Sequence, residues 1–362
     1  MDSDRIRLVV LFGGRSAEHE VSCVSALHVL QAADPTRYEV VPVGITRDGR
    51  WIAADEAIAA LGAGAGALPD PDTSTGPEVD PLPAVAPRSA GEQVVVLPLL
   101  HGPMGEDGTV QGLLELAGVP YAGAGVLGSS VSMDKAVAKE LLTRHGLPVA
   151  DWIALRENEI DDTLPGRVER ELEWPVFVKP ANLGSSVGVT KAAGPGALMA
   201  AVDEALRYDE FVMIEEAISG REIEVAVLGN ADPQASVPGE VVPSRDFYDY
   251  EDKYIDGGAQ LRIPAPLPPE VAADARRLAV AAFKALRVDG MARVDFFYED
   301  GGRGLLVNEI NTIPGFTPIS MYPKLWEASG LPYPKLLDEL VRLALERNQR
   351  RRRFDTDWHR QG

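Results

Sequence analysis

Four polar side chains near the end of the chain have the types and spacing of a metal-phosphate site. Arg293 and Asp295 lie on one apolar run, Glu309 and Asn311 lie on the next, and an Asp-Gly-Gly turn separates the runs. This pattern predicts a β-hairpin, in which alternate residues share a face. Pairing centred on Gly302 would place Asp295 opposite Glu309 and Arg293 opposite Asn311, although a bulge would shift this register by one residue. Carboxylate and amide oxygens suit Mg²⁺, whose shell is completed by substrate phosphates.

The alternative reading of this hairpin is a solvated polar face that binds nothing. The residues that follow it, Thr312-Ile-Pro-Gly-Phe-Thr317, form a turn and do not continue the strand. A polar strand that ends in such a turn is more typical of a site than of an exposed sheet face, so we favour the metal site.

Composition limits the classes of function. The chain has 362 residues, of which 45% are hydrophobic and 25% charged, as is typical of globular proteins with two or three domains. The net charge of −20 argues against nucleic acid or an anionic membrane as the main partner. Cys23 is the single cysteine, which excludes an intrachain disulfide. The N-terminus lacks the features of a signal peptide and no run reaches the length of a membrane span, so we expect a cytoplasmic protein.

The first third of the chain predicts an open parallel α/β sheet. An apolar strand at residues 7–12 runs into the turn Gly13-Gly-Arg-Ser16, and a helical pattern follows from about 18 to 32. Further strands are predicted at 39–43 and 93–100. Between residues 53 and 92 the chain is rich in Ala, Gly, Pro and Asp, and we expect a partly mobile insertion with no packed core of its own.

The rest of the chain predicts α+β units. A strand at 175–180 leads into a glycine-containing loop, and a second short strand at 187–191 follows. The later elements are predicted as a helix at 195–207, strands at 211–216, 222–228 and 240–242, a helix at 269–286, the hairpin, and a helical region to about 346.

Two lysines indicate an anion site. Lys179 ends a strand just before Gly184-Ser-Ser186, so an ammonium group and backbone N–H groups can face the same anion. No Gly-Lys-Ser/Thr follows, so this is not a Walker loop, and a plain hairpin turn is the alternative. Lys135 lies in the first turn of a helix whose N-cap we expect at Ser132. The helix dipole would repel this lysine unless an anion lies nearby, which favours a phosphate contact. The alternative is an ordinary surface lysine with no ligand.

Several other polar residues have two readings. Glu215 and Glu216 end a strand where a ribose or adenine could be bound, and Glu222 follows, but each also suits a solvated strand end. Glu18, at a helix start, would cap the helix or bind a substrate ammonium group. His101 follows a buried strand at the sheet edge where open α/β folds bind ligands, and its alternative role is a structural brace.

One segment has the composition of a lid. Tyr248-Asp-Tyr-Glu-Asp-Lys-Tyr254 lies in an irregular stretch before Gly257-Gly258. A polar, aromatic loop of this kind suits a lid that closes over a reacting centre and excludes water. A surface loop of mixed charge is the alternative.

Five segments, in order and spread over nearly the whole chain, closely resemble the D-alanine–D-alanine ligases, which are ATP-grasp enzymes. These segments are Gly13–Ser22, His101–Gly112, Val178–Gly188, Tyr248–Tyr254 and Asn308–Gly315. The resemblance implies a three-domain ATP-grasp architecture. Its expected parts are an N-terminal α/β domain (1–128), a central subdomain (129–216), a C-terminal subdomain with the metal site and lid (217–348), and a basic tail (349–362).

The resemblance also implies a role for each matching residue. Glu18 would bind the ammonium group of the first D-alanine, with Ser185 and Tyr254 as a hydrogen-bonded gate, and His101 would lie near the substrate. Arg293 and the N–H of Gly315 would stabilise an oxyanion. The carboxylate of the second D-alanine would bind Lys253, Ser320 and the Met321 amide. The metal ions would be held by Asp295, Glu309 and Asn311. The residues that would bind the nucleotide are Lys135, Lys179, Glu215, Glu216, Glu222 and Asn308.

The resemblance implies a reaction in which ATP joins two D-alanines through an acyl phosphate, for peptidoglycan precursors. Expected cofactors are ATP and two Mg²⁺ ions, with Mn²⁺ as a substitute. A homodimer is expected, with no nucleic-acid or membrane partner. The alternatives are D-alanyl-D-lactate synthesis, or another D-amino-acid ligation, and a non-catalytic nucleotide-binding module. Tyr254 in the lid favours amide formation over the ester.

Overall fold

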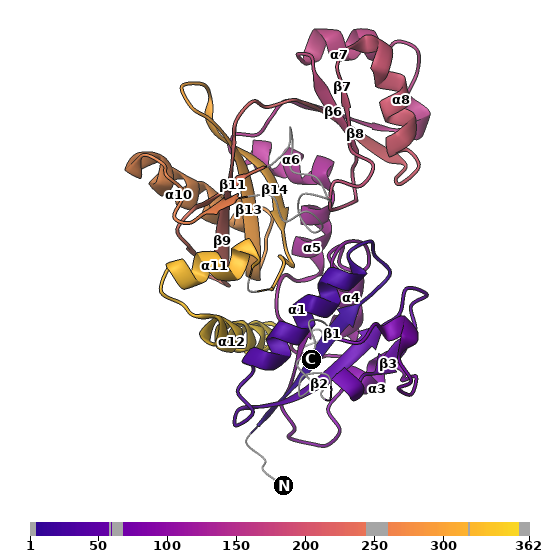
Figure 1. Ribbon diagram of the computed structural model, residues 1–362, viewed down its shortest axis with the longest axis vertical. Coiled ribbons are helices and arrows are strands. Elements are labelled where there is room, and N and C mark those ends of the chain that lie inside the picture. The colour runs from indigo at the N-terminus through magenta and orange to yellow at the C-terminus, as the bar shows by residue number, and fades with distance from the viewer. Residues whose placement is uncertain (1–4, 58, 60–67, 244–259, 318, 355–362) are drawn as a thin grey trace, which may run out of the picture.

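The protein folds around three β-sheets (Figure 1). The computed structural model describes residues 5–57, 59, 68–243, 260–317 and 319–354. The mixed α/β and α+β class expected from the sequence is confirmed. Among the described helices, none is both long enough and apolar enough to cross a membrane.

The N-terminal sheet has the strand order β3-β2-β1-β4. The predicted parallel pairing is confirmed for β1 (Ile6–Gly13), β2 (Tyr38–Ile45) and β4 (Val94–Pro98), while the short edge strand β3 (Trp51–Ala53) runs antiparallel to β2. Parallel strands are covered on both faces, and β1 accordingly reads as a continuous buried apolar run. The helix α1 (His19–Ala32) follows β1 after a short turn, and α4 (Thr109–Leu116) follows β4 after the loop that contains His101 and Glu106.

The described part of the 53–92 insertion is packed against this sheet. It contains η1 (Pro71–Thr73) and α3 (Pro81–Val85). As expected, it has no core of its own, because Leu68 and Val85 are buried among residues of the main sheet and its helices. Residues 68–92 therefore form a fitted part of the N-terminal lobe and not a loose linker.

The central sheet has the order β5-β8-β6-β7 and is entirely antiparallel. Helices α7 and α8 pack together over its core at the top of Figure 1. The elements are β5 (Trp152–Arg156), η2 (Glu157–Glu159), α7 (Leu164–Glu171), β6 (Val176–Pro180), β7 (Thr190–Ala192), α8 (Pro195–Ala205) and β8 (Phe211–Glu216).

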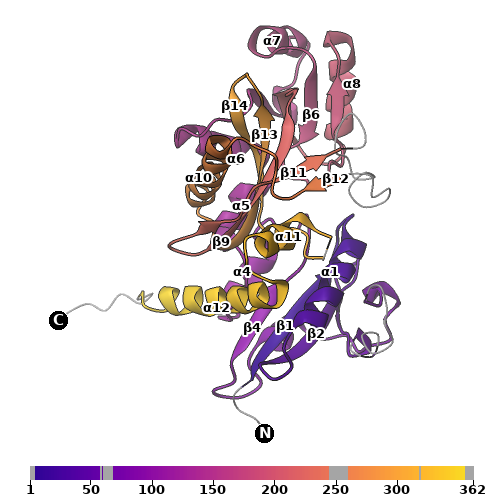
Figure 2. The same ribbon diagram turned by 60° about the vertical axis from the view of Figure 1, so that its left-hand side comes forward.

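The third sheet carries the predicted hairpin. Its order is β12-β11-β9-β13-β14, with β10 also paired to β9. Its strands are β9 (Arg221–Gly229), β10 (Gln234–Ala235), β11 (Gly239–Val242), β12 (Gln260–Arg262), β13 (Gly290–Glu299) and β14 (Gly304–Asn311). The helix α10 (Pro269–Ala285) packs on this sheet, and α11 (Met321–Ala328) and α12 (Tyr333–Arg351) complete the chain towards the N-terminal lobe (Figure 2).

Two consecutive helices connect the lobes, and their boundary corrects one expectation. Ser132 lies inside α5 (Val126–Met133), and the N-cap of α6 (Lys135–Arg144) is Asp134, whose side chain accepts a hydrogen bond from the N–H of Val137 at 3.0 Å. The N-cap therefore lies two residues later than expected, at Asp134, whose backbone is extended. The following helix packs through Ala138 into the core of the third sheet.

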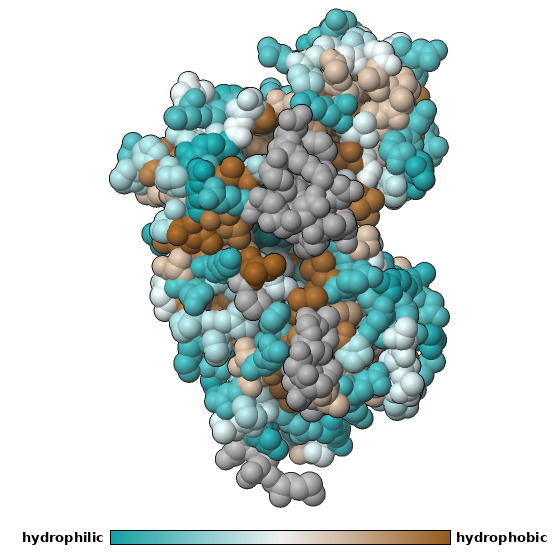
Figure 3. Space-filling view, in the orientation of Figure 1, coloured by the Kyte–Doolittle hydropathy of each residue, from teal (hydrophilic) through white to brown (hydrophobic). Residues whose placement is uncertain are grey.

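Apolar residues gather in a band across the middle of one face, where the lobes meet, whereas the outer surfaces of the lobes are mostly hydrophilic (Figure 3). The residues discussed below come from loops and strand ends of all three sheets.

Candidate active site

Three carboxylates form a row across adjacent strands of the third sheet. Glu224 of β9 pairs with Asp295 of β13, which pairs with Glu309 of β14. Arg293 pairs with Asn311 in the same ladder, so the predicted hairpin register is confirmed at all four residues. The register shifts between Asp295 and the next residue of β13, and this β-bulge separates the site from the outer half of the hairpin.

Arg293 binds two members of this row. Its Nε and Nη2 atoms each lie 2.7 Å from an oxygen of Asp295, and its Nε is 3.0 Å from Oε2 of Glu224. Burial acts to lower the pKa of Arg293, but the neighbouring carboxylates of Asp295 and Glu224 outweigh it and raise the pKa well above its usual value. The guanidinium group is therefore a fixed positive charge held in one orientation.

The donor set of the row fits a hard divalent cation. Asp295 and Glu309 offer carboxylate oxygens in register. The amide nitrogen of Asn311 donates to Oδ2 of Asp295 at 2.8 Å, which leaves the amide oxygen of Asn311 as its ligand atom. An oxygen-only set with excess negative charge suits Mg²⁺ or Mn²⁺ better than a softer metal.

A buried cluster of two lysines and one glutamate joins the central sheet to α6. Glu215 is 3% exposed and binds Lys139 as well as Lys179, whose Nζ lies 2.5 Å from Oε2. Burial alone would raise the pKa of Glu215, but the two lysines outweigh it and lower the pKa to about 2. Glu215 is therefore a buried anion that fixes the ammonium groups of both lysines.

The predicted anion loop lies beside Lys135. The Nζ of Lys135 donates to the carbonyl of Leu183 at 2.5 Å. Ser185 and Ser186 both have positive φ, at 54° and 59°, which turns the backbone sharply within the loop. Lys135 and the Gly184–Ser186 loop are far apart in the sequence, and the fold places them side by side.

The three other predicted nucleotide ligands differ in their surroundings. Glu216 accepts a hydrogen bond from the N–H of Asp151 at 2.7 Å and pairs with Arg303 of the hairpin at 2.6 Å. Glu222 lies on β9 opposite Phe297, on the same face as the carboxylate row. Asn308 lies at the β-bulge of β14, next to Glu309.

Glu18 lies where the N-terminal and central lobes approach each other. It is the N-cap residue of α1 and is 8% exposed. A Cβ placed on Gly102 would lie 3.8 Å from its Oε2, and one placed on Gly184 would lie 3.7 Å from it. The structure therefore brings Glu18 to the anion loop of the central sheet, as the assignment of Ser185 beside it requires.

His101 and Glu106 form hydrogen bonds with the backbone of Ile313, which follows the hairpin. Nδ1 of His101 donates to the carbonyl of Ile313 at 2.9 Å, and the N–H of Ile313 donates to Oε1 of Glu106 at 3.1 Å. The other oxygen of Glu106 accepts the N–H of Gly102 at 2.7 Å. Burial lowers the pKa of His101, so its Nε2 is an unprotonated acceptor. Two residues of the N-terminal lobe thus hold the turn that carries Gly315.

The end of that turn is fixed by Ser320, the N-cap residue of α11. Its Oγ accepts the N–H of Thr317 at 3.1 Å, and a Cβ placed on Gly315 would lie 2.9 Å from the same oxygen. Met321 is the first residue of α11, so its N–H belongs to the first turn, where helices bind anions. Lys253 and Tyr254 lie outside the described residues.

Comparison with known proteins identifies the family of this chain. The family model described as the D-ala D-ala ligase C-terminus matches residues 141–342, and that of the D-ala D-ala ligase N-terminus matches residues 7–124. The chain belongs to the D-alanine–D-alanine ligase family. A D-alanine–D-alanine ligase from Natranaerobius thermophilus is 45% identical, and the match covers 98% of this chain and 99% of that protein.

Two solved structures share the fold. The D-alanine–D-alanine ligase from Coxiella burnetii has a TM-score of 0.82 and 37% identity, covering 96% of this chain and 98% of that one. A D-Ala:D-Ser ligase from Enterococcus faecalis has a TM-score of 0.83 and 34% identity, covering 94% and 99%. The fold is therefore common to ligases with different second substrates.

Three residues of this ligase site were missed from the sequence. Glu224 carried a usable signal, because it stands two residues after Glu222 and so shares its face of a strand. The sequence signal for Lys139 and Glu106 was weaker. A lysine on a helix and a glutamate in a loop are usually surface residues, and only the structure shows the burial and the partners of these two.

Replacing Lys139 should destabilise the ligase strongly. Lys139→Met keeps the length of the side chain but leaves the buried carboxylate of Glu215 with only one lysine partner. The free energy of unfolding should therefore fall by about 3–5 kcal/mol. Chemical denaturation measures this loss. Lys284→Met, an exposed lysine of α10, is the matched control and should change stability by less than about 0.5 kcal/mol. Equal effects of the two variants would contradict the buried cluster.

Glu106 should make stability fall as pH rises. Burial and then the nearby Glu18 raise the pKa of Glu106 from 4.5 to about 8, despite its two N–H donors. The folded state therefore binds a proton that the unfolded state releases, and this contribution is complete below pH 4.5 and lost as pH rises through 8. In Glu106→Gln, the pH dependence of the free energy of unfolding should be shallower by about 1 kcal/mol per pH unit within this range. An unchanged slope in denaturation experiments would contradict this coupling.

Proposed function

We propose that the protein joins two D-alanines, with hydrolysis of ATP to ADP and phosphate, to supply D-alanyl-D-alanine for peptidoglycan. The observation that carries this proposal is the row Glu224-Asp295-Glu309 with Arg293 fixed among its carboxylates, within a chain related to ligases over nearly its whole length. A non-catalytic nucleotide-binding module would have no need for such a costly arrangement of buried charge.

The first D-alanine would bind through its ammonium group to Glu18. His101, as a neutral imidazole, would present Nε2 as an additional acceptor near this substrate. Ser185 lies on the adjoining loop, and Tyr254 would complete the gate from the lid. The carboxylate of the second D-alanine would meet Lys253, the Ser320 hydroxyl and the Met321 amide.

ATP would lie between the central and third sheets. The proposed nucleotide contacts are Lys135, Lys179, Glu215, Glu216, Glu222 and Asn308. Glu215 would act mainly by fixing Lys179, since both of its oxygens are occupied by lysines. An ammonium group held in this way attracts phosphate oxygens without first losing side-chain freedom.

The reaction would proceed in two displacements. The carboxylate of the first D-alanine takes the γ-phosphoryl group of ATP and becomes an acyl phosphate, which makes its carbonyl carbon a good acceptor. The amine of the second D-alanine then attacks that carbon and phosphate leaves. Arg293 and the N–H of Gly315 would stabilise the oxyanion formed between these events. Water must be excluded because acyl phosphates hydrolyse, and the 248–254 segment is the proposed lid.

Asp295, Glu309 and Asn311 would hold two Mg²⁺ ions, with Mn²⁺ as a substitute. Bound metal would neutralise negative charge on the transferring phosphoryl group. The excess of carboxylate over guanidinium charge in the row supports this assignment, since such a row repels itself without a cation.

We also propose that the chain is divided into three domains, residues 1–128, 129–216 and 217–348, followed by a tail at 349–362. We further propose that the protein is located in the cytoplasm and forms a homodimer. Exposed apolar side chains on α4 and α5 support a partner surface, since Leu116 is 90% exposed and Leu127 is 49% exposed.

A second candidate function is ligation of D-alanine to a different acceptor. The similarity to a D-Ala:D-Ser ligase over 94% of this chain favours testing D-serine, and D-lactate is the ester-forming acceptor to compare. Tyr254 in the lid supports the amide-forming reaction with a second D-alanine.

The assay follows from this choice. Purified protein with ATP and Mg²⁺ should release phosphate when D-alanine is supplied, and D-alanyl-D-alanine should appear in equal amount. Mixtures of D-alanine with D-serine or D-lactate near neutral pH should still give mainly D-alanyl-D-alanine by mass spectrometry. Phosphate release with another amino acid but none with D-alanine would contradict the proposal.

Arg293 should matter more for turnover than for nucleotide binding. Arg293→Ala removes the proposed contact to the oxyanion, so kcat should fall by about 10²–10³ while the Kd for ATP changes little. The variant also leaves Asp295 and Glu224 without their bonded cation, so its folding is checked by circular dichroism before the kinetics are compared. Arg293→Lys keeps the charge without the two-pronged contact to Asp295 and should recover only part of the loss. Arg277→Ala, an exposed arginine of α10, should leave both quantities unchanged. Equal losses of turnover and nucleotide affinity in Arg293→Ala would contradict an oxyanion role.

A further inference from the structure

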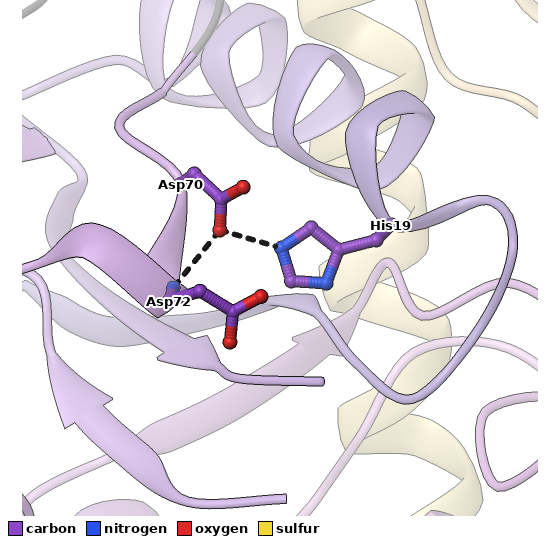
Figure 4. Close-up of side chains that lie close together, drawn as sticks. All are labelled: His19, Asp70 and Asp72. Carbon is purple, nitrogen blue, oxygen red and sulfur yellow. Dashed lines mark hydrogen bonds and ion pairs between the residues drawn. The ribbon is translucent and has the colours of Figure 1, made fainter. Parts of the chain in front are cut away.

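An ion-pair cluster ties the 68–92 segment to the start of α1. His19 is fully buried, and its Nε2 lies 3.1 Å from Oδ1 of Asp70 (Figure 4). Its Nδ1 lies 2.8 Å from the carbonyl oxygen of Gly14. The carboxylate and the carbonyl oxygen are both acceptors, so a ring N–H can be donated to either of them. A single side chain thus connects the turn after β1 with a residue 51 positions away.

This cluster has the ligand types of a metal centre, but an arginine already pairs with its carboxylates. His19, Asp70 and Asp72 each present a possible ligand atom, and these atoms lie within 4.8 Å of one another. The guanidinium group of Arg47 lies 3.1 Å from Asp70 and 2.6 Å from Asp72, and it also pairs with Glu20. A cation would have to displace Arg47, so the geometry favours a structural ion-pair network.

Asp70 is held firmly in place. Its Oδ1 accepts the N–H of Asp72 at 2.9 Å as the N-cap of η1, in addition to its bond with Arg47. The next residue, Pro71, packs against the sheet so closely that a Cβ placed on Gly44 would lie 2.8 Å from its Cγ. The carboxylate can therefore serve as a fixed anchor for His19.

The anchored histidine sits next to Glu18 in sequence. The turn between β1 and α1 is also closed by the bond from the N–H of Gly13 to Oγ of Ser22, at 2.8 Å. These contacts fix the direction in which the first turn of α1 leaves the sheet. Glu18 then points towards Gly102 and the central loop, while the ring of His19 points inwards to Asp70.

We propose that His19 and Asp70 are positioning residues for Glu18, so that the 68–92 segment controls how tightly the first D-alanine is bound. This inference rests on the proposed role of Glu18 in binding the substrate ammonium group. Neither His19 nor Asp70 touches the substrate. Both hold the carboxylate of Glu18 in the orientation that binds the substrate. Without them, this orientation would have to be fixed during binding, which would weaken the affinity for D-alanine.

Asp70→Ser is the discriminating variant. Serine still caps η1, but its side chain is too short to reach Nε2 of His19. The KM for the first D-alanine should rise by about tenfold, because the variant loses a charge-assisted bond that fixes the site. The KM for ATP and kcat at saturating D-alanine should stay within about twofold of the wild type. Asp70→Asn keeps both the cap and an acceptor oxygen but loses the negative charge, so the KM for D-alanine should rise by about threefold instead of tenfold.

Asp72→Ser is the matched control. It removes a carboxylate from the same cluster, the one that contacts Arg47 but not His19. Its kinetics should match the wild type. The proposal is overturned if Asp70→Ser leaves the KM for D-alanine unchanged, if Asp72→Ser raises that KM equally, or if the KM for ATP rises as much as that for D-alanine.

Stability and activity controls keep the result interpretable. If Asp70→Ser does not fold, the decision passes to Asp70→Asn, which must raise the KM for D-alanine and not that for ATP, and an unchanged KM overturns the proposal. A wild type that releases no phosphate with D-alanine would refute the proposed function itself. With an active wild type, the variants test positioning alone.

Discussion

The structure depends on one electrostatic constraint, which is that Glu224, Asp295 and Glu309 can share one face of a sheet only if a cation lies among them. Carboxylates in directly opposed cross-strand positions repel each other, and burial increases that repulsion. Arg293 supplies the cation on the same strand as Asp295 and is bonded to two of the three. The pairing of β9, β13 and β14 and the placement of Arg293 are therefore parts of a single arrangement.

The same sheet would carry little function without contacts from the other lobes. The turn that follows β14 is held at Ile313 by His101 and Glu106, which both follow β4 at the carboxyl edge of the parallel sheet. Open α/β sheets bind ligands at that edge because loops and helix N-termini converge there. A contact between the central sheet and the hairpin, from Glu216 to Arg303, joins the remaining pair of lobes.

The sequence was most informative where chemistry and strand periodicity coincide. The pairing of Asp295 with Glu309 was predicted from a turn centred on Gly302. Next to the turn the strands are instead paired about a point between Gly301 and Gly302, and the β-bulge between Asp295 and Phe296 shifts the register by one residue, which produces the predicted pair. Local pattern could not reveal that Lys139 is buried or that Asp70 reaches a histidine 51 residues away, since these facts depend on packing between distant segments. The N-cap at Asp134 was misplaced because Ser132 offers the same capping chemistry two residues earlier.

Two charge clusters of opposite sign explain how a protein with a net charge of −20 can be built to bind anionic substrates. In one cluster Glu215 holds two lysines, leaving an excess of positive charge; in the other Arg293 lies among three carboxylates, leaving an excess of negative charge. A nucleotide phosphate is attracted by the first and a divalent cation by the second, so a metal-bound nucleotide fits both better than either component alone. Because each cluster is locked by its own counter-ion, the overall charge of the chain matters less than these fixed local fields.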